Sequence, residues 1–216
     1  MFFGLFEDKK SKQPPLPNPL NLRTGCAVEL DLLPFQMLEQ KLQMALPEGI
    51  QTIEAAGFID LGAGATISRF YTADDGFIQI STTGGYGIEN IDDIKLFTFE
   101  QTHSIASQKG ADYWSSEQGL IGQPLFKLEN TDYQRVWDAP VNGKIEPVNF
   151  IETVKSRDTS IASYEVEHLS MLYQRPIDSC DRQEYLLVSL EFTGDDEATA
   201  VVSLGIDLDR SSMQIM

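Results

Sequence analysis

Short β-rich runs follow one another along most of this chain, and turn signals separate them. Such a succession of hairpins without intervening helices predicts an antiparallel sheet. Asp74-Asp75-Gly76 is one strong hairpin signal, and Gly194 to Glu197 form another turn. The runs span residues 50–58, 66–72, 76–81, 94–101, 160–174, 184–192 and 198–207. We expect them to form a sandwich or a half-open barrel.

Three weaker signals complete the predicted fold. Apolar residues recur at helical spacing over residues 33–46, with Pro34 in the first turn, so a helix is expected there. Residues 124–129 and 133–138 form a predicted hairpin, and residues 211–216 a predicted edge strand. The resulting class is α+β, predominantly antiparallel β, with one helix near the start of the body.

The N-terminal residues 1–22 differ from the rest of the chain. Four prolines between Pro14 and Pro19 force an extended segment that can join neither a helix nor a central strand. The aromatic head before them suggests either a sticky linker or a docking peptide. We therefore expect an extended tail over 1–22 and a single β-rich domain over 23–216, with a possible subdivision within 102–123.

Charge excludes several classes of function. Sixteen Lys and Arg stand against thirty-three Asp and Glu, which gives a net charge of −17. So acidic a surface repels nucleic acid and anionic lipid and favours a basic protein partner. The sequence contains no apolar stretch of transmembrane length and no secretory signal, so a cytoplasmic protein is expected, with Cys26 and Cys180 reduced.

Two glycine-rich segments could approach a ligand. Gly62-Ala63-Gly64 resembles a dinucleotide loop, but β-branched residues follow it where a phosphate cradle needs a helix, so a hairpin corner is the better interpretation. Gly84-Gly85-Tyr86-Gly87 could bring backbone close to a ligand, or form an ordinary loop.

Few residues are available for nucleophilic or metal chemistry. With only two His and two Cys, a Cys180–His168 pair is conceivable but is not indicated by any motif. The acidic clusters at Asp74, Asp92 and Asp195 lack the spacing of a calcium loop and suggest solvated turns, or a weak cation site. No cofactor or metal site is predicted, and catalytic residues stay unassigned.

Aromatic residues are the best candidates for partner contacts. Both tryptophans fall within twenty-five residues, alongside tyrosines and an arginine, the residue types that dominate interface hot spots. Such a cluster can equally be core. The candidate partner-binding residues are Phe2, Phe3, Leu5, Phe6, Tyr113, Trp114, Arg135 and Trp137.

Several longer segments resemble one bacterial family. Residues 114–126 with Tyr133-Gln134-Arg135-Val136-Trp137, then Met171 to Arg175, residues 184–189 and residues 202–207 are together similar to the YjfK-type family of uncharacterised cytoplasmic proteins. The resemblance spans roughly residues 25–210. It implies no catalytic residues. It does imply an accessory role in an envelope-stress or peptide-amine modification system.

Two hypotheses of function follow. The first is a non-enzymatic interaction protein that uses the tail and the aromatic region against a basic or membrane-associated partner. The alternative is a small-molecule- or cation-binding domain with carboxylate-based activity, which requires a concave pocket with convergent acidic side chains. Exposed strand edges would also permit a homo-oligomer.

Overall fold

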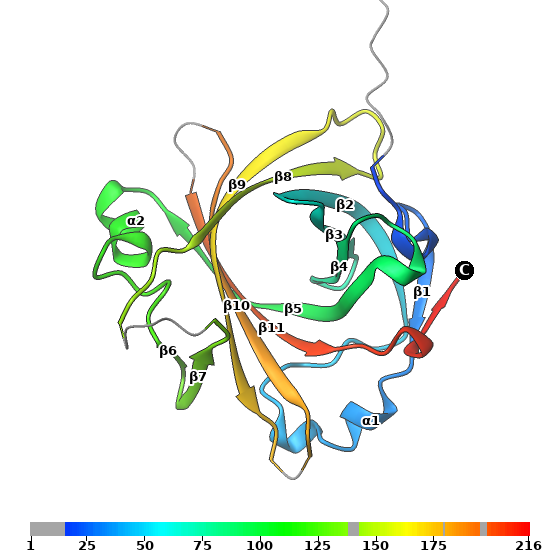
Figure 1. Cartoon of the computed structure of the whole chain (residues 1–216), viewed down its shortest axis with the longest axis horizontal. Helices are drawn as coiled ribbons and strands as arrows, with labels where there is room; N and C mark the ends of the chain where they lie inside the picture. The colour runs from blue at the N-terminus through cyan, green and yellow to red at the C-terminus, as the bar shows by residue number, and fades with distance from the viewer. Residues whose placement is uncertain (1–15, 138–142, 179, 195–197) are drawn as a thin grey trace, which may run out of the picture.

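The computed structural model describes residues 16–137, 143–178, 180–194 and 198–216, and its framework is an antiparallel β-barrel (Figure 1). Each strand pairs with the next, and the last returns to the first. Around the ring, the strands are β2 (Ile50–Gly62), β3 (Ala65–Thr72), β4 (Gly76–Thr83), β5 (Ile91–Ile105), β11 (Ala198–Asp207), β10 (Gln183–Phe192), β9 (Tyr164–Pro176) and β8 (Val148–Ser156).

The described chain is mostly β and its barrel is closed, so the expectation of an α+β protein built as a sandwich or half-open barrel was wrong. Closure depends on β8, which the sequence patterns did not predict. Its Phe58–Thr153 pairing joins it to β2, and its Phe150–His168 pairing joins it to β9. Because a closed sheet leaves no free edge among these strands, the barrel does not expose the ladder groups that an open sheet would present.

The predicted hairpins are confirmed. Residues 50–58, 66–72, 76–81 and 94–101 all lie within consecutive paired strands, and the turn before Gly76 places Asp75 at φ +49°. Short polar residues tolerate this left-handed conformation, which explains why Asp-Gly marks the turn. The predicted edge strand also forms, as β12 (Met213–Ile215) paired with β1 (Ala27–Leu30).

Additional elements surround the barrel (Figure 1). The hairpin of β6 (Leu125–Leu128) and β7 (Thr131–Arg135) pairs with the part of β9 that β8 does not reach, and α2 (Gln108–Ser115) lies on the same side. Outward side chains of the barrel pack against this outer layer. The main hydrophobic core therefore lies outside the barrel wall, and Leu22, Phe70, Tyr133, Tyr173 and Leu204 belong to it.

Residues 33–46 do not form the expected helix. Helical turns are limited to α1 (Leu33–Gln36) and the 3₁₀ turn η2 (Glu39–Lys41). The backbone N–H groups of Gln43 and Met44 instead donate to Glu184 Oε1 at 2.8 and 2.9 Å. A buried carboxylate thus captures the donors that a continuing helix would direct to its own carbonyls.

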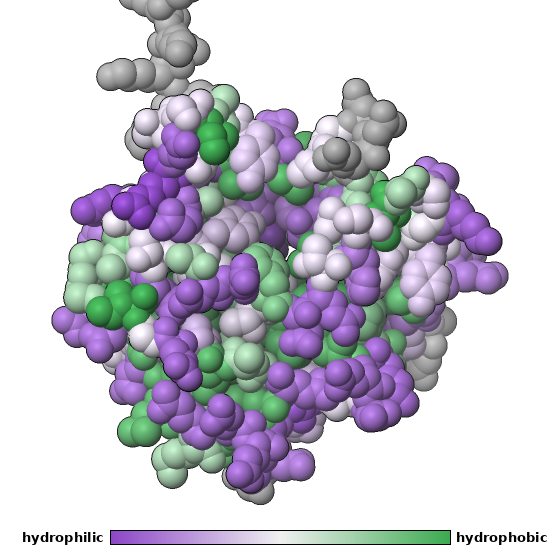
Figure 2. Space-filling view, turned by 180° about the vertical axis from the view of Figure 1, so that it is seen from behind, coloured by the Kyte–Doolittle hydropathy of each residue, from purple (hydrophilic) through white to green (hydrophobic). Residues whose placement is uncertain are grey.

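The start of the described chain packs on the body. Pro19 and Leu22 are buried, so the last part of the expected tail joins the outer layer. Figure 2 shows hydrophilic side chains spread over one face of the molecule, with smaller apolar areas among them. None of the helices in the described ranges is long and apolar enough to cross a membrane.

Candidate functional site

The barrel interior contains a buried ion pair. Arg69 on β3 pairs with Gly57 of β2, and Gly57 in turn pairs with Val154 of β8. Glu152 is two residues from Val154 on the same strand, so its side chain and that of Arg69 face the same interior. Arg69 Nη1 donates to Glu152 Oε2 at 2.8 Å. The arginine is 4% exposed and the glutamate 0%. Close pairing is required here because an unpaired charge at this depth would be strongly destabilising.

Neighbouring side chains fix the geometry of this pair. The Arg69 guanidinium lies 5.2 and 5.5 Å from the ring centroids of Phe77 and Phe150, at cation–π distance. Tyr71 Oη donates to Glu152 Oε1 at 2.7 Å. A β-carbon on Gly57 would lie 1.7 Å from that same oxygen, so only glycine leaves room for the glutamate.

A histidine and two serines continue the polar cluster. His168 stacks on Phe150, and its Nε2 lies 3.1 Å from Glu152 Oε2. Its Nδ1 lies 3.2 Å from Ser189 Oγ, and the hydroxyl of Ser189 is hydrogen-bonded to that of Ser170. This chain of groups connects the ion pair to the neighbouring strands β9 and β10.

The cluster shifts the titration of its carboxyl and phenol groups. Burial alone would raise the pKa of Glu152, but Arg69, His168 and Tyr71 outweigh it and hold that pKa below its usual range. Burial raises the pKa of Tyr71 well above its usual range, and the charge of Glu152 adds to the rise. Glu152 is therefore ionised and Tyr71 a neutral donor at neutral pH.

Aromatic rings fill one end of the barrel. Phe77 stacks on Phe97 with centroids 5.0 Å apart, and it also contacts Tyr71 and Phe99. The remaining space among these rings is small, about 40 Å³. The rings therefore act as a plug behind Arg69.

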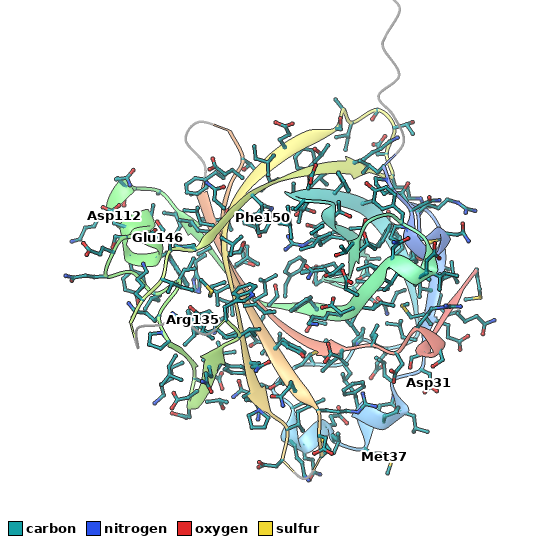
Figure 3. All side chains as sticks on the ribbon, in the orientation of Figure 1. Asp31, Met37, Asp112, Arg135, Glu146 and Phe150 are labelled. Atoms are coloured by element: carbon teal, nitrogen blue, oxygen red, sulfur yellow. The ribbon has the colours of Figure 1, made fainter. Side chains whose placement is uncertain are left out.

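The other end of the barrel holds a cavity of about 310 Å³, which we call the barrel cavity. Arg69 lines it, and Figure 3 shows Phe150, another of its lining residues, on the barrel wall. Its apolar lining side chains include Leu61, Ile67, Val148, Phe150, Leu172 and Leu187. This volume and mostly apolar lining are typical of small-molecule sites.

Three hydrogen-bond donors form a row across the wall of the cavity. Arg69, Gln79 and Lys95 lie directly opposite one another on β3, β4 and β5, and we call them the donor row. Arg69 Nε donates to Gln79 Oε1 at 3.1 Å. Because arginine has no acceptor, this bond orients the amide and leaves Gln79 Nε2 without a hydrogen-bond partner among the described residues.

Two aspartates stand nearer the mouth of the cavity, and we call them the acidic rim. Asp92 and Asp93 both line the cavity. Asp93 Oδ2 accepts a hydrogen bond from Lys95 Nζ at 3.0 Å, whereas its Oδ1 is buried and has no hydrogen-bond partner in the described chain. Lys95 is also 2.9 Å from Asp207 Oδ1, so it is shared between two carboxylates. The rim therefore keeps an excess of negative charge.

Both glycine-rich segments lie at this mouth. Gly84 N donates to Gly64 O at 2.9 Å, so the β2–β3 and β4–β5 connections contact each other. Gly64 lies between two paired strands, at φ +83°, which confirms the hairpin corner. Leu61 and Ala65, which flank that corner, line the barrel cavity.

The structure separates the predicted partner-binding residues. Tyr113 and Trp137 are 63% and 46% exposed, whereas Trp114 and Arg135 are buried. Arg135 lies outside the barrel on the β7 side (Figure 3), where its Nη1 donates to the carbonyls of Gly122 and Gly143. Trp137 lines the barrel cavity. Phe2, Phe3, Leu5 and Phe6 lie outside the described residues.

The remaining chemical candidates do not assemble into a site. Cys26 and Cys180 are both free thiols. Cys180 lines a surface depression of about 460 Å³ with Phe35 and Arg182, whereas His168 is inside the barrel. Within the described ranges, no group of three His, Cys, Asp or Glu side chains could hold a metal ion.

A family profile described as "Protein of unknown function (DUF2491)" matches residues 1–214. The chain belongs to the DUF2491 family. It is also 35% identical over 221 residues to "Uncharacterized protein YjfK" of Escherichia coli strain K12, an alignment that covers 100% of this chain and 98% of that protein. The resemblance to a YjfK-type family is thereby confirmed. No solved structure matches the chain.

For this DUF2491 member, sequence reasoning missed most of the barrel site. Arg69, Gln79, Lys95 and Glu152 fall in unremarkable runs, and only their shared inward orientation unites them. A usable signal existed in β4, where polar Gln79 stands between the buried Ile78 and Ile80 of the other face; in β3 the face opposite Arg69 carries Ser68 as well as Phe70. The same alternation is typical of a sheet whose polar face is exposed to solvent, so it did not indicate that these polar side chains face a barrel interior.

Proposed function

We propose that this protein is a non-enzymatic binding module that holds a small amphipathic molecule in the barrel cavity. The observation that carries the proposal is a mostly apolar cavity of about 310 Å³ crossed by the donor row, in which Gln79 Nε2 has no partner among the described residues. Apolar walls would hold the body of the ligand by burial, and the donors would orient an accepting group.

A dye-binding experiment tests the proposal. Ser81 lines the cavity, so Ser81→Trp would fill it, while Ile151→Trp on the exposed outer face of β8 is the matched control. The neutral dye N-phenylnaphthylamine should fluoresce with the wild type and with Ile151→Trp, and at least about tenfold more weakly with Ser81→Trp. Equal fluorescence with both variants, or none with the wild type, would overturn the proposal.

A second candidate function is binding to a protein partner, and the exposure of Tyr113 and Trp137 favours it. The net charge of −17 favours a basic partner, and on the family resemblance the partner would be membrane-associated and belong to an envelope-stress or peptide-amine modification system. Tyr113→Ala should then reduce capture of the partner from native lysate, whereas Tyr164→Ala, at an exposed tyrosine of β9, should not. Equal capture by both variants would count against this surface.

A further inference from the structure

The two ends of the barrel cavity differ in the hydrogen-bonding groups that they offer. The donor row presents N–H groups, including the Gln79 amide on a side chain that is 8% exposed. The acidic rim presents carboxylate oxygens, including the buried and unpartnered Oδ1 of Asp93. Gln79 Nε2 has no partner among the described residues, so an acceptor on a ligand would complete its hydrogen bonding. A donor on the ligand would do the same for Asp93, whose side chain is 43% exposed and whose Oδ1 has no partner among the described residues.

The strand register sets the spacing between the ends. On β4, Gln79 of the donor row is two residues from Ser81, which pairs with Asp93 of the rim, whereas the ammonium of Lys95 reaches the rim itself. At the rise of a β-strand, this places the two levels about 7 Å apart along the strand. Apolar side chains, including Ile67 and Leu187, line the cavity alongside.

Charge complements this arrangement. At the rim, Lys95 Nζ contacts the carboxylates of both Asp93 and Asp207, whereas Asp92, which also lines the cavity, accepts a hydrogen bond from Thr83. Trp137 adds an aromatic surface at the same cavity, and aromatic faces attract cations. The outer end of the cavity therefore favours a positive group, whereas the inner end favours an acceptor.

From these observations we infer that the ligand is a small zwitterion with an apolar body between its charges, of the ω-amino acid type. Its carboxylate contacts Arg69 and Gln79, and its ammonium contacts Asp93. This inference rests on the proposed function, because it assumes that the barrel cavity is a ligand site. It adds the chemical class and the orientation of the ligand.

Isothermal titration calorimetry with matched probes tests the inference. ε-Aminocaproate carries both charges at about the required spacing, hexanoate and hexylamine carry one each, and γ-aminobutyrate is too short. We expect ε-aminocaproate to bind at least about tenfold more tightly than each of the other three, the factor for one hydrogen bond to a charged group. Equal affinity for hexanoate or hexylamine would overturn the inference.

Variants locate each end of the probe. Asp93→Asn should weaken ε-aminocaproate about tenfold and leave hexanoate unchanged, and Asp132→Asn, at an exposed carboxylate of β7 away from the cavity, should change neither. Unchanged affinity in Asp93→Asn would overturn the orientation. If ε-aminocaproate does not bind, but the dye still fluoresces with Ile151→Trp and not with Ser81→Trp, the cavity binds ligands of another chemical class. That result would overturn this inference and leave the proposed function standing.

Discussion

Among single residues, Glu152 should contribute most to the stability of the barrel interior. In Glu152→Gln, Arg69 keeps its charge but loses its carboxylate, at a position that is almost fully buried. Removing one partner of a buried pair costs about 3–5 kcal/mol, so we expect that loss in the free energy of unfolding measured with urea. Glu54→Gln breaks the exposed pair with Arg157 and should cost less than about 1 kcal/mol. Equal losses would contradict the prediction.

The same residue predicts a pH dependence. Folding lowers the pKa of Glu152, so the unfolded chain binds the proton more readily and stability rises with pH. The contribution of Glu152 is complete above its unfolded pKa of about 4.3, and it is lost as pH falls through the lower folded pKa. The difference in stability between wild type and Glu152→Gln should therefore shrink below about pH 4. A difference that stays constant into acid would show that ionisation of Glu152 is not involved.

Among the elements, β2 and β8 meet at a position where only glycine fits. In Gly57→Ala the added methyl group would overlap Glu152 Oε1, so either the ion pair or the strand pairing must shift. We expect a loss of about 3 kcal/mol or more in urea unfolding, in the range for overpacking and disrupted buried pairs. Gly49→Ala meets no atom within 4 Å but has φ +67°, and its backbone strain should cost only about 1 kcal/mol.

The elements also show what the sequence could predict. Hairpins with Asp-Gly or glycine turns were predicted because their signals are local. Strand β8 was missed because its inward positions include the charged Glu152 and its outward positions include the exposed Ile151, which inverts the usual alternation. The helix over 33–46 was predicted from genuine apolar spacing, but Glu184, about 140 residues away, binds its backbone. Pairing between distant segments is not visible in local patterns.

The candidate site was out of reach of the sequence for a related reason. Arg69, Gln79 and Lys95 are adjacent only after β3, β4 and β5 pair in one register. Trp137 was selected as an aromatic contact residue, and it does reach the cavity, but through the position of the chain after β7 rather than through an aromatic cluster. The charge count indicated the acidic character of the chain, but not that Asp92 and Asp93 would flank a cavity.

At the scale of the whole molecule, the apolar core and the barrel cavity are lined by largely different residues, although Met171 belongs to both. Stability and ligand binding should therefore respond to different substitutions. Leu22→Ala removes a fully buried side chain from the outer core and should lower the free energy of unfolding by about 2–5 kcal/mol. It should leave the affinity for N-phenylnaphthylamine unchanged at temperatures where the variant is folded.

Ser81→Trp should show the opposite pattern. Ser81 is only partly buried and lines the cavity, so the larger side chain can occupy existing space at a cost of less than about 3 kcal/mol while it excludes the dye. Urea unfolding and dye titration on the same samples measure both quantities. If folded Leu22→Ala also loses the dye, the barrel wall transmits changes in the core to the cavity, and the two sides act as one unit.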